Sequence, residues 1–462
     1  MNSFKNKSFK TLLLVIFTAF AITMASSVYG DFSKNNTYET LKLFSDVLEE
    51  IEKNYVESID SSELIEKAIH GMIGDLDPHS AFLPPDAFKG LQEDTRGEFG
   101  GIGIVISKKN DLLTVISPME GTPAYRAGIQ ANDVIVKVDD QPTKDMMLWE
   151  AVKLMRGEPG TSVKITVARE GEGKALTFEL KREIIPLESV RYATPVTGFG
   201  YLWITNFREK TTDEVKNAIA ALQAENGPLK GLILDLRDNP GGLLSQSVSV
   251  SDLFLETGDI VSIRGRDDRE MEIYRAAKGD ENYDFPIVVL INSGSASAAE
   301  IVAGALQDNK RALVIGTTSF GKGSVQTVRP LRNGYALKYT IAKYYTPSGE
   351  SIQASGIRPD LVVQRRLLDE SEGGVDVRRL REEDLENHLL GVDEEEMQEL
   401  TQPEEESESL DKKEEFEKLM RLRDVVYEHD DRDPRVLLLD SQINRAYEIL
   451  KGHNLFKAKA SS

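Results

Sequence analysis

The chain has 462 residues, enough for two to four domains, and its 77 acidic and 56 basic side chains give a formal net charge of −21. This acidic excess argues against a protein that binds nucleic-acid phosphates, because that function needs a basic face. Cysteine is absent, which excludes disulfides, thiolate zinc sites and a cysteine nucleophile. Two-thirds of the net charge lies in residues 369–408, and we expect a solvated acidic linker over 366–410.

Residues 1–30 have the features of a secretory signal. Three lysines precede an apolar run over 12–25, and small residues follow as far as Gly30. The run is shorter than the roughly 20 residues that a membrane-spanning helix needs. We therefore expect an exported protein, periplasmic or otherwise extracytoplasmic. Whether the segment is removed or kept as a membrane anchor stays open.

The next segment, 36–95, is expected to be helical. Apolar residues recur at steps of three and four from Leu41 to Ile51. A second helix is expected to begin at Asp60, which forms a capping-box pattern with Glu63. The prolines at 84 and 85 are expected to end regular structure.

Residues 97–183 combine short alternating strands with one helix, expected over 148–155. This segment resembles a PDZ domain in its glycine loop at 100–104, its Pro-Ala-Tyr-Arg-Ala-Gly turn at 123–128, and Asn-Asp-Val-Ile at 132–135. PDZ domains bind a peptide C-terminus as an added strand, with loop amides on its carboxylate. The resemblance implies that Gly101, Ile102, Gly103 and Ile104 bind a peptide C-terminus; alternatively, the glycines only form a tight turn.

From 184 to 365 the pattern changes to strands alternating with helices, as in an α/β domain. Continuous apolar runs at 231–236, 287–291 and 312–315 predict buried strands. Ligands of open α/β sheets bind beyond the carboxyl ends of such strands, so the residues that follow each run are the candidates for chemistry.

The loop over 316–322 spells G-x-x-x-x-G-K, the beginning of a phosphate-binding loop. The hydroxyl that would hold Mg²⁺ is missing, because Gly323 occupies its position. The residues from Ser324 to Pro330 are expected to be extended, whereas a phosphate-binding loop must open a helix. Both observations argue against nucleotide binding.

The residues after the second apolar run, 292–300, are rich in serine and alanine. A serine nucleophile explains this composition better than a helix cap alone does. Ser297 lies on a sharp strand-to-helix turn, although S-x-x-E with Glu300 is also an ordinary helix cap. None of the five histidines lies near it in sequence, but a lysine acts as a general base when burial lowers its pKa. Lys322 is the candidate for this general base. Gln326 is expected on the same side of an extended segment, where its side chain could orient the lysine by hydrogen bonding. The alternative is that Lys322 is an ordinary solvated surface lysine.

Together with Leu-Asp-Pro-His-Ser at 76–80 and Leu-Arg-Asp-Asn-Pro-Gly-Gly at 236–242, these motifs make the chain resemble the carboxyl-terminal processing proteases. The resemblance covers about 44–361. It implies an α/β protease core, a mixed sheet with helices related to crotonase- and Clp-type folds, with a PDZ domain and flanking helical segments. It also implies a serine endopeptidase that needs no metal or cofactor. Its expected site residues are the Ser297 nucleophile, the Lys322 base, the Gln326 orienting group, and backbone amides of Ala298 with Gly241 or Gly242 as the oxyanion hole.

The expected substrates are exported proteins or peptides with free C-termini, and nucleic acid is not expected as a partner. Apolar residues in 411–462 predict further helices, which dock on the N-terminal helices, on a second subunit or on an adaptor. We expect a homo-oligomer formed through the terminal helices. Two alternatives concern activity. In the first, the chain is a PDZ scaffold whose protease core is inactive. In the second, the PDZ domain holds Lys322 away from Ser297 until a peptide binds, and Arg156 transmits the binding of the peptide to the core.

Overall fold

The structure is a computed structural model that divides into two compact units, Met1–Asp75 and Leu76–Ser462. The predicted signal segment, most of the predicted acidic linker and the first part of the predicted C-terminal helices lie outside the described residues. No helix among the described residues combines the length and apolar character needed to cross a bilayer. The structure describes residues 37–109, 112–144, 146–266, 271–279, 283–368, 381–385, 388–389 and 433–460.

The first unit contains a helix over 37–54 and α2 (Ser61–Gly74), which confirms the helical prediction. Asp60 caps α2 by accepting a hydrogen bond of 2.8 Å from the Ser62 N–H. The second half of the expected capping box is not formed, because Glu63 instead pairs with Lys67 one turn later, at 2.8 Å. Several apolar side chains of the helix over 37–54 are exposed, namely Tyr38, Leu41, Leu43, Phe44 and Val47.

The second unit opens with β1 (Ala81–Leu83) and α3 (Pro85–Arg96). The prediction that the prolines at 84 and 85 end regular structure is wrong. Pro85 is the first helical residue of α3, a position whose N–H has no partner within a helix and whose φ suits proline. Gly97 then ends α3 in the left-handed conformation, with φ 74°.

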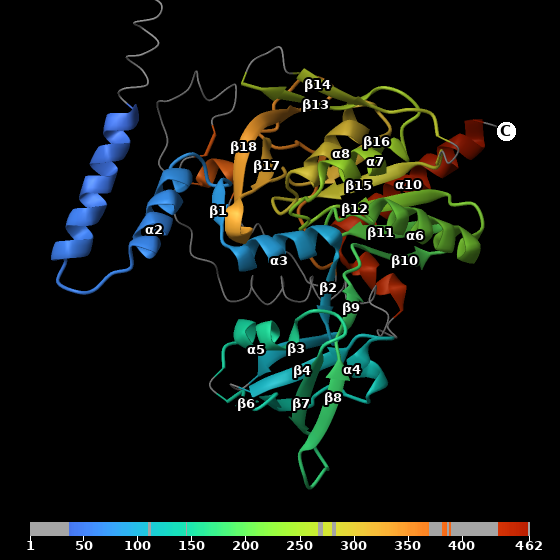
Figure 1. The fold of residues 1–462 in the computed structure, drawn as a ribbon. Helices are drawn as coiled ribbons and strands as arrows, with labels where there is room; N and C mark the ends of the chain where they lie inside the picture. The colour runs from blue at the N-terminus through green and yellow to red at the C-terminus, as the bar shows by residue number, and fades with distance from the viewer. Residues whose placement is uncertain are drawn as a thin grey trace, which may run out of the picture. The chain divides into compact units, whose positions relative to one another are not determined.

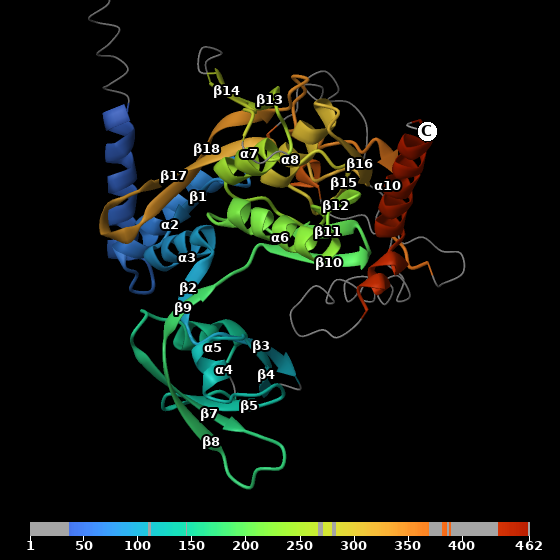
Figure 2. The same cartoon turned by 90° about the vertical axis from the view of Figure 1, so that its right-hand side faces the viewer.

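The segment that resembles a PDZ domain is joined to the α/β domain through the two-stranded ribbon of β2 and β9 (Figures 1 and 2). Its sheet has the order β3-β4-β5-β7-β8, and β6 pairs with β5. β3 therefore lies at one end of the sheet with an open edge, the arrangement that strand addition requires. The elements are β2 (Glu98–Gly101), β3 (Ile104–Lys109), β4 (Leu112–Pro118), α4 (Pro123–Arg126), β5 (Val134–Val138), β6 (Gln141–Pro142), α5 (Leu148–Met155), β7 (Ser162–Ala168), β8 (Leu176–Lys181) and β9 (Glu183–Pro186).

The α/β domain is built on a six-stranded sheet of order β10-β11-β12-β15-β16-β19, parallel except for the β10–β11 pair. The three predicted buried strands are its β12, β15 and β16. Because neighbouring strands are parallel, their carboxyl ends meet at one edge and bring together the loops that follow. The elements are β10 (Val190–Val196), β11 (Phe199–Ile204), α6 (Thr211–Asn226), β12 (Gly231–Asp235), α7 (Leu244–Asp252), β15 (Ile287–Ile291), α8 (Ala298–Asp308), β16 (Ala312–Gly316) and β19 (Leu361–Val362).

A second, antiparallel sheet carries the chain onward from the Lys322 loop. Its order is β1-β18-β13-β14, and β17 also pairs with β18. The segment after Lys322 is the strand β17, so the prediction of an extended stretch in place of a helix is confirmed. The remaining elements are β13 (Asp259–Gly265), β14 (Met271–Arg275), β17 (Ser324–Pro330), η1 (Arg332–Gly334) and β18 (Ala336–Tyr345).

The C-terminal helices pack on the core sheet itself, an arrangement that the sequence did not indicate. Alternate residues of a strand face opposite sides of the sheet. In β12, Leu232 and Leu234 face the side covered by α6 and α8, whereas Ile233 faces the other side. That other side is covered by η4 (Pro434–Leu439) and α10 (Ser441–Ala460) (Figure 2). Their side chains Leu437, Ile443 and Leu450 are buried there.

A buried ionic cluster fastens α10 to the loop after β12. The Arg237 guanidinium is fully buried and bonds both Asp235, at 2.6 Å, and Asp440, at 2.9 Å. Asp440 also accepts a hydrogen bond of 2.7 Å from Arg365 and caps α10 through the Gln442 N–H. Burial disfavours the charged guanidinium, but the two carboxylates outweigh it and raise the pKa of Arg237.

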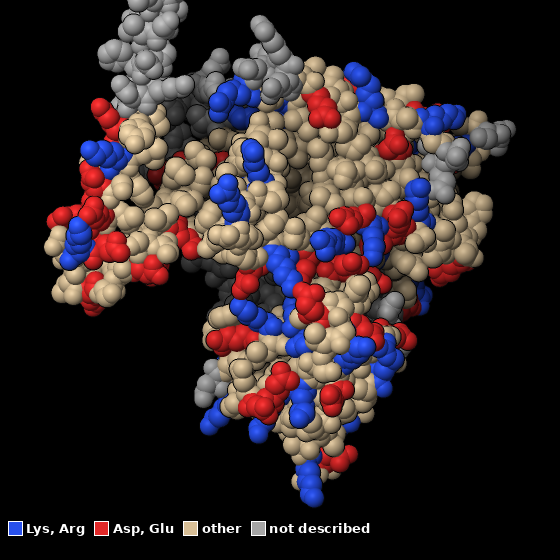
Figure 3. Space-filling view, viewed as in Figure 1, with Lys and Arg blue, Asp and Glu red and all other residues tan. Residues whose placement is uncertain are grey.

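Acidic and basic side chains are intermixed over the PDZ domain on the face shown in Figure 3. Ion pairs join this domain to α3, including Lys153 with Asp86 and Lys89 with Glu158, both at 2.9 Å. Over the PDZ domain in this view, neither sign of charge predominates.

Removing one charge of the buried cluster should cost much of the core's stability. We expect Asp440→Asn to destabilise the core by about 3–5 kcal/mol, because it leaves Arg237 incompletely compensated while keeping the shape of the helix cap. Chemical unfolding followed by Trp203 fluorescence in a Trp149→Phe background measures this, since Trp203 packs beside Leu437 and Ile443. The control Glu448→Gln, on the exposed side of α10, should stay within about 0.5 kcal/mol. Equal stability of the two variants would contradict the prediction.

Candidate active site

Ser297 stands on the sharp turn between β15 and α8, where the sequence predicts it. Its backbone has φ 54° and ψ −114°, a conformation that residues other than glycine rarely adopt. Such strain at a strand-to-helix turn is typical of a nucleophile held at the entrance of a helix. The Ser297 side chain is half-buried, and Ala298 is the first residue of α8.

Glu300 joins the Ser297 turn to the Lys322 loop. Its carboxylate is fully buried and accepts hydrogen bonds from the backbone N–H groups of Ser297, at 2.7 Å, and Lys322, at 3.0 Å, both on the same oxygen. Its other oxygen accepts from the Ser319 hydroxyl, at 2.5 Å, and the Gly321 N–H, at 2.8 Å. Burial raises the pKa of Glu300 to about 7 against the opposing effect of these four donors.

Lys322 is not the solvated surface lysine of the alternative interpretation. It is half-buried, and no salt bridge to it is present among the described residues. Burial lowers the pKa of Lys322, and the nearby charge of Lys338 lowers it further. Glu382, Glu300 and Asp77 act in the opposite direction. The net depression makes a neutral amine more accessible, as a general base requires.

The structure does not join all of the predicted catalytic side chains directly. Within the described residues, no hydrogen bond links the Ser297 hydroxyl to the Lys322 amine. The Gln326 amide donates to the Ser324 hydroxyl, at 2.8 Å, and to Thr340. A shift in the β17–β18 register between Val325 and Gln326 interrupts the simple alternation on which the same-side expectation for Gln326 rested.

Of the residues predicted for the oxyanion hole, Gly241 lies beside Ser297, Ala298 directly follows it, and Gly242 packs against Phe207. A Cβ on Gly241 would come within 2.8 Å of the Ser297 Cβ and 3.0 Å of the Ala298 nitrogen, and Gly241 has φ 101°. The Gly241 N–H donates to the Asn239 side chain, at 2.8 Å. Within the described residues, the N–H groups of Gly242 and Ala298 form no hydrogen bond. These two donors are thus available to a ligand.

The predicted PDZ loop precedes the open edge strand β3. Gly103 has φ 73°, and a Cβ there would lie 2.3 Å from the Thr122 side chain, so this position requires glycine. Ile102 is buried and its carbonyl accepts a hydrogen bond from Ala124. The tight-turn interpretation therefore holds for Gly103, and it is compatible with peptide binding along β3.

Arg156, at the end of α5, contacts the connection to the core. Its guanidinium lies 4.1 Å from the centre of the Phe99 ring and 3.7 Å from the Glu93 carboxylate of α3. The residue therefore lies between the PDZ helix and the elements that lead to the core.

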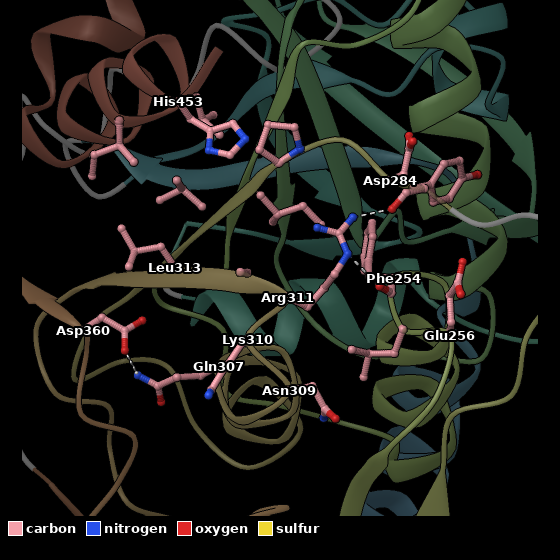
Figure 4. A pocket seen from close by; sticks show the side chains of 18 of the residues that line it. Phe254, Glu256, Asp284, Gln307, Asn309, Lys310, Arg311, Leu313, Asp360 and His453 are labelled. Carbon is pink, nitrogen blue, oxygen red and sulfur yellow. Dashed lines mark hydrogen bonds between the residues drawn. The ribbon is translucent and has the colours of Figure 1, made fainter. Parts of the chain in front are cut away.

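One cavity is remote from these groups. It has a volume of about 1100 Å³ and is lined by residues at the amino ends of β15 and β16, including Leu313 (Figure 4), whereas Ser297 follows the carboxyl end of β15. Its wall is held by hydrogen bonds between Arg311 and the Phe254 carbonyl and between Gln307 and Asp360, both 2.9 Å. The candidate active site is therefore placed at Ser297 because this residue follows the carboxyl end of a parallel strand, and not because of the volume of a cavity.

Sequence reasoning identified Glu300 only as a helix cap. The cap is real, but the three additional donors come from a loop about 20 residues away, which local spacing does not reveal. It also missed Glu382, whose fully buried carboxylate lies beside Lys322, and Asp440. Glu382 lies in the 366–410 segment that the sequence predicts to be a solvated acidic linker, and the prediction is wrong at this residue, because His79 and Gln353 hydrogen-bond its buried carboxylate. No motif in the sequence pointed to the role of Asp440.

Comparison with known families agrees with this arrangement. Residues 198–363 match peptidase family S41, residues 114–169 match a PDZ domain, and residues 19–87 match the N-terminal domain of the activating protease CtpB.

Several curated proteins are similar over most of their length. A carboxy-terminal-processing protease of Bartonella bacilliformis is 46% identical over 383 residues, covering 82% of this chain and 87% of the relative. The carboxy-terminal processing protease CtpA of Bacillus subtilis is 36% identical over 360 residues, covering 77% and 76%. The solved photosystem II D1 C-terminal processing protease is 31% identical, with coverage of 70% and 92% and a TM-score of 0.40. The chain belongs to the carboxy-terminal processing serine proteases of peptidase family S41.

Proposed function

We propose that this chain is an endopeptidase that uses Ser297 as nucleophile and Lys322 as general base. The observation that carries the proposal is the shared Glu300 oxygen, which binds the backbone N–H of both residues and so brings the two loops together. The strained Ser297 turn and the depressed pKa of Lys322 support the two roles.

The reaction is acyl transfer. Ser297 Oγ forms a bond to the peptide carbonyl carbon while its proton passes to Lys322 Nζ. The negative charge develops on the carbonyl oxygen, and the amides of Ala298 and Gly242 are the best donors for it because the Gly241 N–H is already used by Asn239. When the C–N bond breaks, Lys322 returns the proton to the leaving amine. Water then attacks the acyl-enzyme with the same base, and Ser297 is released.

The role of Gln326 is proposed as support for Lys322 in the substrate complex. Its amide now bonds Ser324 and Thr340, so that role requires a rearrangement at the start of β17. This agrees with the alternative in which Lys322 approaches Ser297 only after the PDZ domain has bound peptide. Arg156 lies at the connection through which such a signal would pass.

The dyad proposal predicts loss of cleavage without loss of fold. Ser297→Ala and Lys322→Ala should each lower kcat for an unstructured peptide by about 10⁴-fold or more, because each removes an indispensable partner of the same step. Circular dichroism should show an unchanged fold. Ser293→Ala, in the same loop, serves as the control and should retain activity. Cleavage at the wild-type rate by either dyad variant would refute the assignment.

The surroundings of Lys322 predict the direction of the pH dependence. The active form is the neutral amine, so kcat/KM should rise with pH, with a midpoint below the usual lysine value because burial and Lys338 lower the pKa of Lys322. Lys338→Met removes one of these causes and should move the midpoint to higher pH. A profile of kcat/KM against pH for the two proteins measures this. A midpoint that moves to lower pH in Lys338→Met would contradict it.

We further propose that the PDZ segment selects substrates by their free C-termini, with the 101–104 loop on the carboxylate and the peptide added along β3. The open edge of β3 and its position beside this loop support the proposal. The substrates are proposed to be exported proteins, cleaved near their C-termini. The signal features of residues 1–30 support export, and the exposed apolar side chains of the helix over 37–54 support a homo-oligomer formed through terminal helices.

Amidation of a peptide's C-terminus tests the PDZ role. The amidated form should bind the Ser297→Ala variant about 10- to 100-fold more weakly than the free acid, since a charge-assisted hydrogen bond contributes about 1.5–3 kcal/mol. Isothermal calorimetry measures both affinities on the full chain. Equal affinities would exclude carboxylate recognition.

A further inference from the structure

A short segment beyond the residues matched to the peptidase family reaches the Lys322 loop. Residues 381–385 include the single turn η2 (Glu382–Asp384), whereas the family match ends at residue 363. The Glu382 N–H donates to the Phe320 carbonyl, at 3.1 Å. The Glu382 side chain is completely buried, although its neighbour Glu383 is exposed and pairs with Arg381.

Side-chain contacts of Glu382 reach the other side of Lys322. Its carboxylate accepts a hydrogen bond of 3.1 Å from the Gln353 amide, and the oxygen of that amide accepts one of 3.0 Å from the Gly323 N–H. Together with the bond to Phe320, these contacts tie Glu382 to the residues just before and just after the Gly321–Lys322 pair.

The same carboxylate is held from the opposite direction by His79. The His79 Nε2 hydrogen-bonds both carboxylate oxygens, at 2.8 Å. The backbone N–H of His79 donates a hydrogen bond of 2.8 Å to the Asp77 carboxylate. That carboxylate also accepts a hydrogen bond of 2.7 Å from the Ser80 hydroxyl. Glu382 therefore connects the Asp-Pro-His-Ser segment to the Lys322 loop.

The location of this carboxylate matters for a base that must lose its proton. Four charged groups act on Lys322: Lys338 of β18, Glu300 of α8, Asp77 before β1, and Glu382 of η2. The three carboxylates raise the pKa of Lys322 against the effect of burial and of Lys338. A buried carboxylate is costly to retain, and a neutral side chain of the same shape would serve a merely structural contact.

We propose that Glu382 is a positioning residue for Lys322: through Gln353, Phe320 and His79 it holds the Lys322 loop and places a buried carboxylate beside it. The inference rests on the proposed role of Lys322 as general base. It makes a segment outside the recognised peptidase domain part of the catalytic apparatus.

The test separates charge from shape in the full chain. Glu382→Gln removes the charge and keeps the shape, and should move the acid-side midpoint of kcat/KM to lower pH by about one unit, because one of the carboxylates that oppose the lowering of the Lys322 pKa is gone. Glu382→Asp keeps the charge but withdraws it from its partners, and should leave the midpoint in place while kcat at the plateau falls roughly tenfold to a hundredfold. Glu383→Gln, in the same turn, is the matched control and should match the wild type in both.

Each result decides the proposal. An unmoved midpoint in Glu382→Gln, or the same shift in Glu383→Gln, overturns it. If circular dichroism shows that Glu382→Gln does not fold, Glu382→Asp decides alone, and wild-type kcat in that variant overturns the proposal. Lys322→Ala separates this inference from the dyad proposal. Activity in Lys322→Ala would refute the proposed function itself. If Lys322→Ala is inactive and Glu382→Gln has the wild-type pH profile, only the role of Glu382 is refuted.

Discussion

The Glu300 carboxylate receives four hydrogen bonds inside the protein, three from backbone N–H groups and one from a hydroxyl, and the Ser297 and Lys322 loops are arranged around it. One of its oxygens binds the N–H groups of both Ser297 and Lys322, so neither loop can shift without breaking a bond in a site from which water is excluded. An unmade bond to a buried carboxylate is expensive, which gives this contact its control over the geometry. The strained conformation of Ser297 persists because the surrounding bonds over-determine it.

A second layer of control comes from the C-terminal third of the chain. Asp440 compensates the buried Arg237 directly after β12, and Arg365 also approaches Asp238, at 3.9 Å, in the loop that leads to Gly241 and Gly242. Glu382 bonds the Lys322 loop through Phe320 and Gln353. The peptidase domain recognised by sequence comparison, 198–363, is therefore not the complete structural unit around Ser297 and Lys322. Residues from both sides of it contribute buried charges.

The sequence predicted the parts of the structure that depend on local pattern. Continuous apolar runs identified β12, β15 and β16 closely, because a strand buried on both faces requires such runs. The bounds of β15 and of the helix α5 were predicted to the residue. Proline at 85 was misinterpreted, since the same residue both ends a helix and begins one. The positions of Ser297 and Lys322 follow from the rule that parallel strands present their following loops at one edge. The roles of Glu300, Glu382 and Asp440 depend on contacts between distant segments, and a single sequence contains no pattern that encodes them.

The attachment of α10 has a consequence for the enzyme's own survival. A protease that cuts near C-termini must extend its substrate as a strand, and a helix cannot enter such a site until it has unwound. Leu450 and Ile443 bury the middle of α10 against the core sheet, and Asp440 fixes its beginning through Arg237. Self-digestion of this region therefore has to wait for a local unfolding event that breaks the Arg237–Asp440 pair. Folded molecules present α10 as a packed helix and not as an extended substrate.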